Sequence, residues 1–294
     1  MGIIEDYGSV LLIIAVVCGF LMAWGVGAND VANAMGTSVG SKAITIKQAI
    51  VIAAVFEFAG AYLAGGEVTS TIRKGIIDPS ILAETPHLLV YGMIASLFAA
   101  AIWLLVATIN GWPVSTTHTI VGAIVGFAAV GISVDSVNWG KVGSIVASWV
   151  VSPVLAGTVS FVIYMSVRRF ILGSKTPVQA ARRGVPFYIF LVAFIIGMVS
   201  MVKGLKHVGL SLSFEQSITY SLIFASGLTL FSWLLVRRIK PSSNSAHDEI
   251  MTIERIFGVL GIFTACAMAF AHGSNDVANA IGPLAAVNSV LSSG

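Results

Sequence analysis

One short motif that carries an acid and two amides occurs twice in this chain. Gly27–Ala34 has the sequence Gly-Ala-Asn-Asp-Val-Ala-Asn-Ala, and Gly273–Ala280 repeats it 246 positions later with Ser in place of the first Ala. Over the ten positions from Gly27 to Gly36, eight residues are identical at this offset. We call residues 27–36 the first signature and residues 273–282 the second signature. Their polar residues are Asn29, Asp30 and Asn33 in the first, and Asn275, Asp276 and Asn279 in the second.

The chemistry of these side chains points to a hard cation such as Na⁺, because such ions take carboxylate, amide and carbonyl oxygens as ligands. On a helix, Asn29 and Asn33 share one face. The nearby glycines suit a break in the helix, and a break would add free backbone carbonyls to the site. The alternative is that Asn and Asp only cap a helix end at the membrane surface. Two copies at matched positions favour the cation site.

A second group of polar residues follows Trp112-Pro113-Val114, where Ser115, Thr116 and Thr117 stand together. Pro, Ser and Thr are typical of the first turn and N-cap of a helix. The pattern therefore predicts a helix N-terminus that presents three hydroxyls and unpaired backbone N–H groups, which is an anion-binding arrangement. Its place between two apolar runs predicts a half-helix that begins at membrane depth. A plain N-cap at the bilayer surface is the alternative.

Several other residues in or near the apolar runs have both a functional and a structural interpretation. Glu57 lies inside the second run, where an acid favours an ion pathway over hydrogen-bonded structure. His118 and His272 adjoin the two groups, and each is either a proton relay or, more commonly, a hydrogen-bonded core histidine. The spacing of small residues around Gly65, and of Gly122 with Gly126, predicts close helix packing.

Composition places these groups in a membrane protein. Hydrophobic residues make up 57% of the 294 and charged residues only 10%, with a mean hydropathy of +0.95, whereas a soluble domain carries about 25% charge. Seven apolar runs are long enough to span a bilayer. Two further stretches, 29–43 and 110–131, are too short or too broken to be ordinary spans, and a third such stretch begins at Asn275. The runs are roughly 9–28, 44–64, 87–109, 142–167, 186–202, 216–236 and 254–271.

The distribution of charge predicts which loops are cytoplasmic, and the two cysteines do not indicate a function. The formal charge of +3 is small and argues against nucleic-acid binding. Basic residues gather in 168–184 and in the linker 237–253, which predicts that both are cytoplasmic. Cys18 and Cys266 are expected to be small buried hydrophobes, with no transition-metal site. Glu5 and Asp6 stand where a cleavable signal peptide would carry Lys or Arg, so none is expected.

Charge also constrains the substrate. Lys and Arg are absent from the middle of the apolar runs, so an oxyanion that entered the membrane would need helix dipoles, hydroxyls and accompanying cations to neutralise it. This favours co-transport with Na⁺ over bare anion binding. The Asn/Asp signatures and the Ser/Thr group are then two parts of one site, and a membrane-embedded hydrolase is disfavoured because no Ser-His-Asp order or His/Cys spacing supports one.

With the two signatures and the Pro-Val-Ser-Thr-Thr-His-Thr block between them, the chain resembles the inorganic phosphate transporter (PiT, Pho-4) family and is similar to its prokaryotic sodium/phosphate symporters. The resemblance implies an all-α polytopic membrane protein of the cell (inner) membrane, with inverted repeats and broken or re-entrant helices around a midplane site. It implies phosphate binding at Ser115, Thr116, Thr117, Asp30 and Asp276, and Na⁺ binding at Asn29, Asp30, Asn33, Glu57, Asn275, Asp276 and Asn279.

The repeat gives an expected organisation. Residues 1–236 would form the first repeat with its hairpin at 110–131, residues 237–253 a cytoplasmic linker, and residues 254–294 the start of a second repeat. In the family a second Ser/Thr block follows the second signature; at the repeat offset it would fall near 359, so the second repeat is expected to be incomplete within these residues.

We therefore expect a secondary active transporter, not an enzyme, that imports inorganic phosphate coupled to Na⁺ or H⁺ by alternating access. Na⁺ would bind the signatures first and phosphate would follow onto the hydroxyls. No cofactor is expected besides Na⁺ as coupling ion, and the lipid bilayer is the remaining partner, with homo-oligomer formation left open. The alternatives are a sulfate or other oxyanion permease on the same scaffold, or a passive anion channel.

Overall fold

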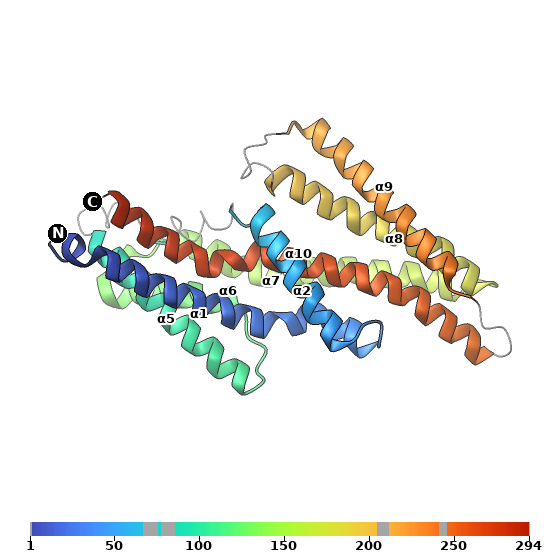
Figure 1. Cartoon of the computed structure of the whole chain (residues 1–294), viewed down its shortest axis with the longest axis horizontal. Helices are drawn as coiled ribbons and strands as arrows, with labels where there is room; N and C mark the ends of the chain where they lie inside the picture. The colour runs from blue at the N-terminus through green and yellow to red at the C-terminus, as the bar shows by residue number, and fades with distance from the viewer. Residues whose placement is uncertain (1, 67–75, 78–85, 205–211, 241–245, 294) are drawn as a thin grey trace. The chain divides into compact units, whose positions relative to one another are not determined.

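The computed structural model describes residues 2–66, 76–77, 86–204, 212–240 and 246–293, and these form helices joined by short connections (Figure 1). An isolated bridge between Ile77 and Val137 is the one β-type pairing in that part of the chain. The α-helices among these residues are α1 (Gly2–Gly40), α2 (Ile46–Ala64), α5 (Pro86–Ile109), α6 (Thr116–Phe127), α7 (Trp139–Val167), α8 (Pro177–Val199), α9 (Phe214–Arg238) and α10 (Ala246–Ser293). The prediction of an all-α protein is confirmed.

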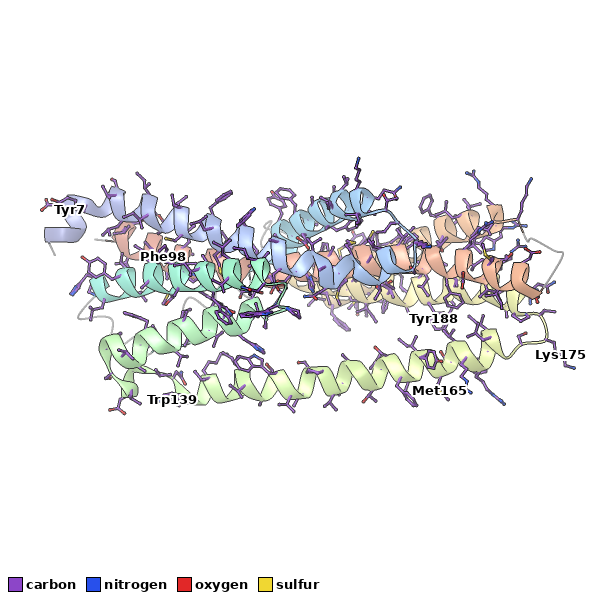
Figure 2. The ribbon with its side chains drawn as sticks, turned by 90° about the horizontal axis from the view of Figure 1, so that it is seen from below. Tyr7, Phe98, Trp139, Met165, Lys175 and Tyr188 are labelled. Carbon is purple, nitrogen blue, oxygen red and sulfur yellow. The ribbon has the colours of Figure 1, made fainter. Side chains whose placement is uncertain are left out.

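Seven of the described helices are long and apolar enough to cross a membrane, which matches the seven predicted runs. They are α1, α2, α5, α7, α8, α9 and α10. Large apolar and aromatic side chains stand outward on them; Tyr7, Phe98, Trp139 and Met165 are each at least 40% exposed and can be followed in Figure 2. Such a surface is compatible with lipid and incompatible with water, so the chain is a multi-pass membrane protein.

The predicted interruption at 110–131 is present. Helix α5 ends at Ile109, Gly111 takes a φ of +67° that favours glycine, and the short helix α6 starts at Thr116. After 12 residues α6 continues into a π-helical turn, Ala128–Ile132. This stretch is too short to span a bilayer, so it supplies the half-helix that the sequence predicted.

The predicted break at the signatures is wrong. Helix α1 continues to Gly40 and α10 continues to Ser293, so neither is interrupted at its signature. The glycines are tolerated because each costs only about 1 kcal/mol relative to Ala in a helix, and packing offsets this cost where Gly25 meets Leu104 of α5. The backbone carbonyls that a break would have freed as cation ligands are therefore engaged in the helices.

The described residues fall into two compact units. The first unit comprises Met1–Asn33, Phe58–Ala147 and His272–Gly294. Within it, α1 and α10 run antiparallel, since Gly8 lies against Leu291 while Gly19 lies against Leu284; the two ends of the chain are neighbours accordingly (Figure 1). Because the helices are antiparallel and packed through small residues, both signatures come to a similar level along the pair.

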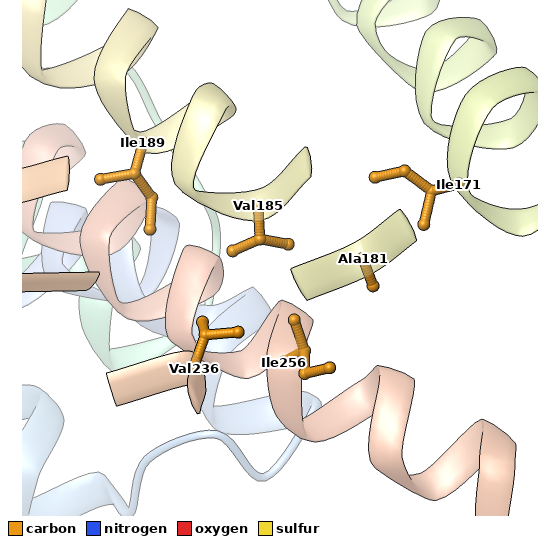
Figure 3. Close-up of a cluster of buried hydrophobic side chains, with 6 residues drawn as sticks. All are labelled: Ile171, Ala181, Val185, Ile189, Val236 and Ile256. Atoms are coloured by element: carbon orange, nitrogen blue, oxygen red, sulfur yellow. The ribbon is translucent and has the colours of Figure 1, made fainter. Parts of the chain in front are cut away.

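The second unit comprises Ala34–Glu57 and Ser148–Ala271. Its centre is a cluster of buried aliphatic side chains from the π-helical turn after α7 and from α8, α9 and α10 (Figure 3). Helices α8 and α9 approach closely where Gly197 meets Ser221. The clustered residues are Ile171, Ala181, Val185, Ile189, Val236 and Ile256. In the same unit, Ser38 donates to the carbonyl of Gly261 at 3.0 Å and ties the end of α1 to α10.

The glycines singled out for close packing behave differently from one another. A Cβ on Gly65 would lie 2.6 Å from the carbonyl oxygen of Ala61 and would also collide with Val277 of the second signature, whereas one on Gly122 or Gly126 would have no atom within 4 Å. The packing role is therefore confirmed for Gly65 and is wrong for Gly122 and Gly126 within the described residues.

We expect Gly65→Ala to lower the apparent Tm of the detergent-solubilised protein by several degrees, because forcing extra volume into a tight contact costs about 1–3 kcal/mol. Gly122→Ala is the matched control and should leave Tm unchanged or raise it, since Ala is the better helix former. Equal losses of stability in both variants would contradict this account of the contact between Gly65 and Val277.

Candidate functional site

A polar cavity of about 400 Å³ lies within the first unit. Its walls come from three segments that are far apart in the sequence: the first signature, the start of the half-helix α6, and the beginning of the second signature. The lining residues are Asp30, Asn33, Pro113, Val114, Ser115, Thr116, Thr117, His272, Asn275 and Asp276. A cavity of this size accommodates a small oxyanion together with cations or water.

The half-helix presents its N-terminus to the cavity. Ser115 is the N-cap, in an extended conformation with φ −80° and ψ 120°, and its Oγ accepts a hydrogen bond from the backbone N–H of His118 at 3.2 Å. The first-turn N–H groups have no intrahelical partner and lie at the positive end of the helix dipole. The predicted N-terminus is confirmed, and it lies at a cavity that also contains the signature acids.

The approach to this half-helix is held by the first signature. The side-chain amide of Asn29 donates to the backbone carbonyl of Trp112 at 3.2 Å. Asn29 is itself buried, so this hydrogen bond fixes the segment that leads into Pro113 and Ser115 relative to α1. Asn29 thus positions the segment that carries the hydroxyls, a role that its place in a repeated motif did not reveal.

We expect Ser115→Ala to speed hydrogen–deuterium exchange at the backbone amide of His118 by about tenfold. Loss of an N-cap costs about 0.5–2 kcal/mol of helix stability, and local opening would rise in proportion. Ser115→Thr keeps a capping oxygen and should exchange at nearly the parent rate. An exchange rate in Ser115→Ala equal to that of the parent would contradict the capping geometry.

The two signature carboxylates make related sets of hydrogen bonds. Asp30 accepts from the hydroxyl of Thr116 at 3.2 Å and from the amide of Asn33 at 3.4 Å. Asp276 accepts from the hydroxyl of Thr117 at 3.4 Å and from the amide of Asn279 at 3.3 Å. Each carboxylate therefore accepts one hydrogen bond from a threonine hydroxyl and one from the side-chain amide of the Asn three positions later.

The second signature makes additional contacts that the first does not. Asn275 donates to Asp276 at 3.1 Å, whereas its counterpart Asn29 is engaged with the Trp112 carbonyl. Asn279 donates to the hydroxyl oxygens of both Thr116 and Thr117, each at 3.2 Å. The half-helix is consequently bound to both copies of the repeat.

Two amide oxygens near the cavity lack hydrogen-bond donors. The Oδ1 atoms of Asn29 and Asn279 are buried and have no partner within the described part of the chain. A buried carbonyl-type oxygen without a donor is costly, and it is the kind of atom that a hard cation coordinates. Both residues were predicted as cation ligands, and these oxygens are compatible with that chemistry.

The structure brings together nearly all the predicted site residues. Asp30, Asn33, Asn275, Asp276 and the three hydroxyl residues line the cavity, and Asn29 and Asn279 hydrogen-bond to segments that line it. Glu57 is half-buried in α2, falls in the second unit, and is not among the lining residues. Among the described residues, no group of three or more His, Cys, Asp and Glu side chains could hold a metal ion.

His272 lines the cavity, although its sequence position alone favoured a core histidine. It is half-buried, and its Nδ1 is buried with no partner among the described residues. The equivalent position in the first copy is Val26, so this imidazole breaks the repeat. Its location directly before the second signature was the one available signal.

The fold and the cavity together define the class of protein. The described residues include seven helices able to span a membrane, and the cavity of the first unit places two acids beside a helix N-terminus with three hydroxyls. This arrangement is suited to binding an anion and cations in a membrane. This is the class of membrane transport proteins.

Comparison with known proteins identifies the family. Residues 26–293 match the phosphate transporter family. A Haemophilus influenzae protein named "Putative phosphate permease" is 51% identical over 295 residues, covering 100% of this chain and 70% of the relative. The chloroplastic inorganic phosphate transporter 2-1 of Arabidopsis thaliana is 41% identical, covering 94% of this chain and 50% of its own length. The chain belongs to the phosphate transporter family, whose members are transporters and not enzymes.

A solved structure supports the same assignment. The chain is similar to a structure described as the sodium-dependent phosphate transporter, with a TM-score of 0.88 and 40% identity, covering 97% of this chain and 69% of that one. The family predicted from the signatures and the Ser/Thr block is confirmed.

Proposed function

We propose that this chain imports inorganic phosphate across the cell (inner) membrane together with Na⁺, or with H⁺ in its place, by alternating access. The observation that carries the proposal is the shared cavity: the hydroxyls at the start of α6 hydrogen-bond to the carboxylates of both signatures. Phosphate transport agrees with the family, and the sodium dependence named for the similar structure supports Na⁺ as the coupling ion.

The proposed phosphate site combines the half-helix with the two acids. Ser115, Thr116 and Thr117 contribute hydroxyls, and the first-turn N–H groups and helix dipole add positive potential. Phosphate at pH 7 still carries a proton, so it can donate a hydrogen bond to Asp30 or Asp276. Sulfate has no such proton, which gives a physical basis for preferring phosphate.

The charges explain why cations are needed. Two carboxylates repel an incoming anion, and His272 is the one basic side chain among the residues that line the cavity. Small cations at the signature oxygens would turn this repulsion into attraction. The proposed cation ligands are Asn29, Asp30 and Asn33 of the first signature, Asn275, Asp276 and Asn279 of the second, and Glu57 as a residue of the ion pathway.

In this mechanism the cations bind first, phosphate follows, and the neutralised site reorients between the two sides of the membrane. We propose that the repeats 1–236 and 254–294, joined by a cytoplasmic linker at 237–253, provide the two elements between which access alternates. This division follows the repeat in the sequence, which predicts related halves around a central site.

The test is uptake of ³²P-phosphate by proteoliposomes with an inward Na⁺ gradient. We expect phosphate to accumulate above its external concentration, and accumulation to stop when a Na⁺ ionophore removes the gradient. Accumulation driven by a pH gradient alone would assign H⁺ as the coupling ion. If phosphate only equilibrated across the membrane, whichever gradient was imposed, the result would contradict the proposal and favour a passive channel. If unlabelled sulfate competed more strongly than unlabelled phosphate, the result would favour an oxyanion permease of different specificity.

A further inference from the structure

One amide stands between the two threonines of the half-helix. Asn279 is 1% exposed, and its Nδ2 lies 3.2 Å from the Oγ1 of Thr116 and 3.2 Å from the Oγ1 of Thr117. An amide nitrogen only donates hydrogen bonds, so the hydroxyl oxygens act as acceptors toward it. The two amide hydrogens are shared among these oxygens and the Oδ1 of Asp276, which lies 3.3 Å away. The hydroxyl hydrogens therefore point away from the amide nitrogen.

Each threonine has a single hydroxyl hydrogen, and a carboxylate takes it. Thr116 donates to Asp30 at 3.2 Å and Thr117 donates to Asp276 at 3.4 Å. A hydroxyl that donates to a carboxylate cannot donate the same hydrogen to a phosphate oxygen. In this arrangement two of the three hydroxyls of the proposed phosphate site are therefore committed to the signature acids.

We propose that Asn279, Thr116 and Thr117 form a hydrogen-bond switch that makes phosphate binding depend on the cation. When Na⁺ occupies the carboxylate oxygens, the hydroxyl hydrogens are displaced from the acids and turn to the phosphate. Asn279 acts as a positioning residue, because its amide keeps both hydroxyl oxygens in place while their hydrogens change partner. The inference rests on the proposed function and adds the atomic origin of its cation-first order.

The unpartnered oxygen of Asn279 supports this assignment. Its Oδ1 is buried and has no donor within the described residues, while the two hydrogens on its nitrogen are shared among the hydroxyl oxygens of Thr116 and Thr117 and the carboxylate of Asp276. One face of the amide thus organises the hydroxyls and the other offers an oxygen of the type that Na⁺ coordinates. A cation at that oxygen and at Asp276 would act on the same residue that aligns the threonines.

The rival explanation is a purely structural tether between the half-helix and the signatures. The two explanations predict opposite changes in Na⁺ affinity for Thr117→Val, which keeps the shape of the side chain and removes its hydroxyl. A switch predicts tighter Na⁺ binding, because the carboxylate of Asp276 no longer shares its charge with a hydroxyl donor, and weaker phosphate binding, because a phosphate donor is lost. A tether predicts that both affinities weaken together.

The experiment measures equilibrium binding to the purified full chain in detergent, using ²²Na⁺ without phosphate and ³²P-phosphate at saturating Na⁺. For Thr117→Val we expect Na⁺ to bind about 3–10-fold tighter and phosphate about tenfold weaker. Thr116→Val should shift both affinities in the same directions through Asp30, which keeps the test open if one variant is poorly folded. Thr119→Val is the control: it removes a hydroxyl that donates to the backbone carbonyl of Ser115 and does not line the cavity, and it should match the parent in both measurements.

Weaker or unchanged Na⁺ binding in both valine variants, with thermal stability like that of the parent, would overturn the switch. That outcome is distinct from failure of the proposed function, in which the parent chain itself would bind no phosphate at saturating Na⁺. A parent that binds phosphate equally well without any alkali cation would overturn the switch while leaving phosphate as the ligand.

Discussion

Replacing Asp276 with Asn is expected to reduce Na⁺-driven phosphate uptake by about 100-fold or more. The Oδ1 of Asp276 accepts hydrogen bonds from Thr117, Asn275 and Asn279, and an amide in its place would carry no charge for a cation. Removing one partner from a buried charged network costs about 3–5 kcal/mol, and about 1.4 kcal/mol corresponds to a tenfold change in affinity. Uptake by proteoliposomes with matched protein content measures the effect.

The control for this variant is Asp135→Asn, which removes an exposed acid from the short 3₁₀ turn before α7. It changes the net charge by the same amount and should leave uptake near the parent value. A Tm measurement on both variants separates loss of transport from loss of folding. If Asp276→Asn retained most of its uptake, the second signature would not be part of the ion and phosphate site.

The second large effect is on anion selectivity. Asp30→Asn should lower the preference for phosphate over sulfate by about tenfold or more, because a carboxylate accepts the proton that phosphate carries at pH 7, whereas an amide can also donate to sulfate. Asp30 is buried, and its neighbours Thr116 and Asn33 are donors. We therefore expect discrimination between phosphate and sulfate to depend on the carboxylate of Asp30, which accepts a hydrogen bond from Thr116 of the half-helix.

The measurement is the ratio of the concentrations at which unlabelled phosphate and sulfate each displace ³²P-phosphate. A ratio is used because loss of a proposed cation ligand weakens both anions, and the ratio isolates the effect of the substrate proton. Asn33→Asp offers a comparison, since it adds an acid beside the cavity without removing Asp30. An unchanged ratio in Asp30→Asn would reject Asp30 as the acceptor and leave Asp276 as the candidate.

Much of the fold followed from local patterns. Seven apolar runs predicted seven helices able to span a membrane, and the Ser-Thr-Thr sequence after Pro113 predicted the N-terminus of α6, whose N-cap is Ser115. These features depend on hydropathy, on capping chemistry and on proline, which act over a few residues. They can therefore be recognised without knowing the tertiary structure.

Two features of the site could not be predicted in this way. Helices α1 and α10 continue through the signatures, because a glycine costs only about 1 kcal/mol relative to Ala in a helix and does not by itself break it. The link from Asn279 to Thr116 joins residues 163 positions apart, and a motif cannot specify such a partner. The repeat showed that the two signatures are equivalent, but it did not show that one half-helix binds both.

The most direct test of the account is a crystal structure of the protein grown with Na⁺ and arsenate, with arsenic located by its anomalous scattering. Arsenate has the charge and shape of phosphate, so one arsenic peak should lie in the cavity with its oxygens within hydrogen-bonding distance of the hydroxyls of Ser115, Thr116 and Thr117. A peak at another place in a protein that still transports phosphate, with the cavity between Asp30 and Asp276 free of arsenic, would contradict it.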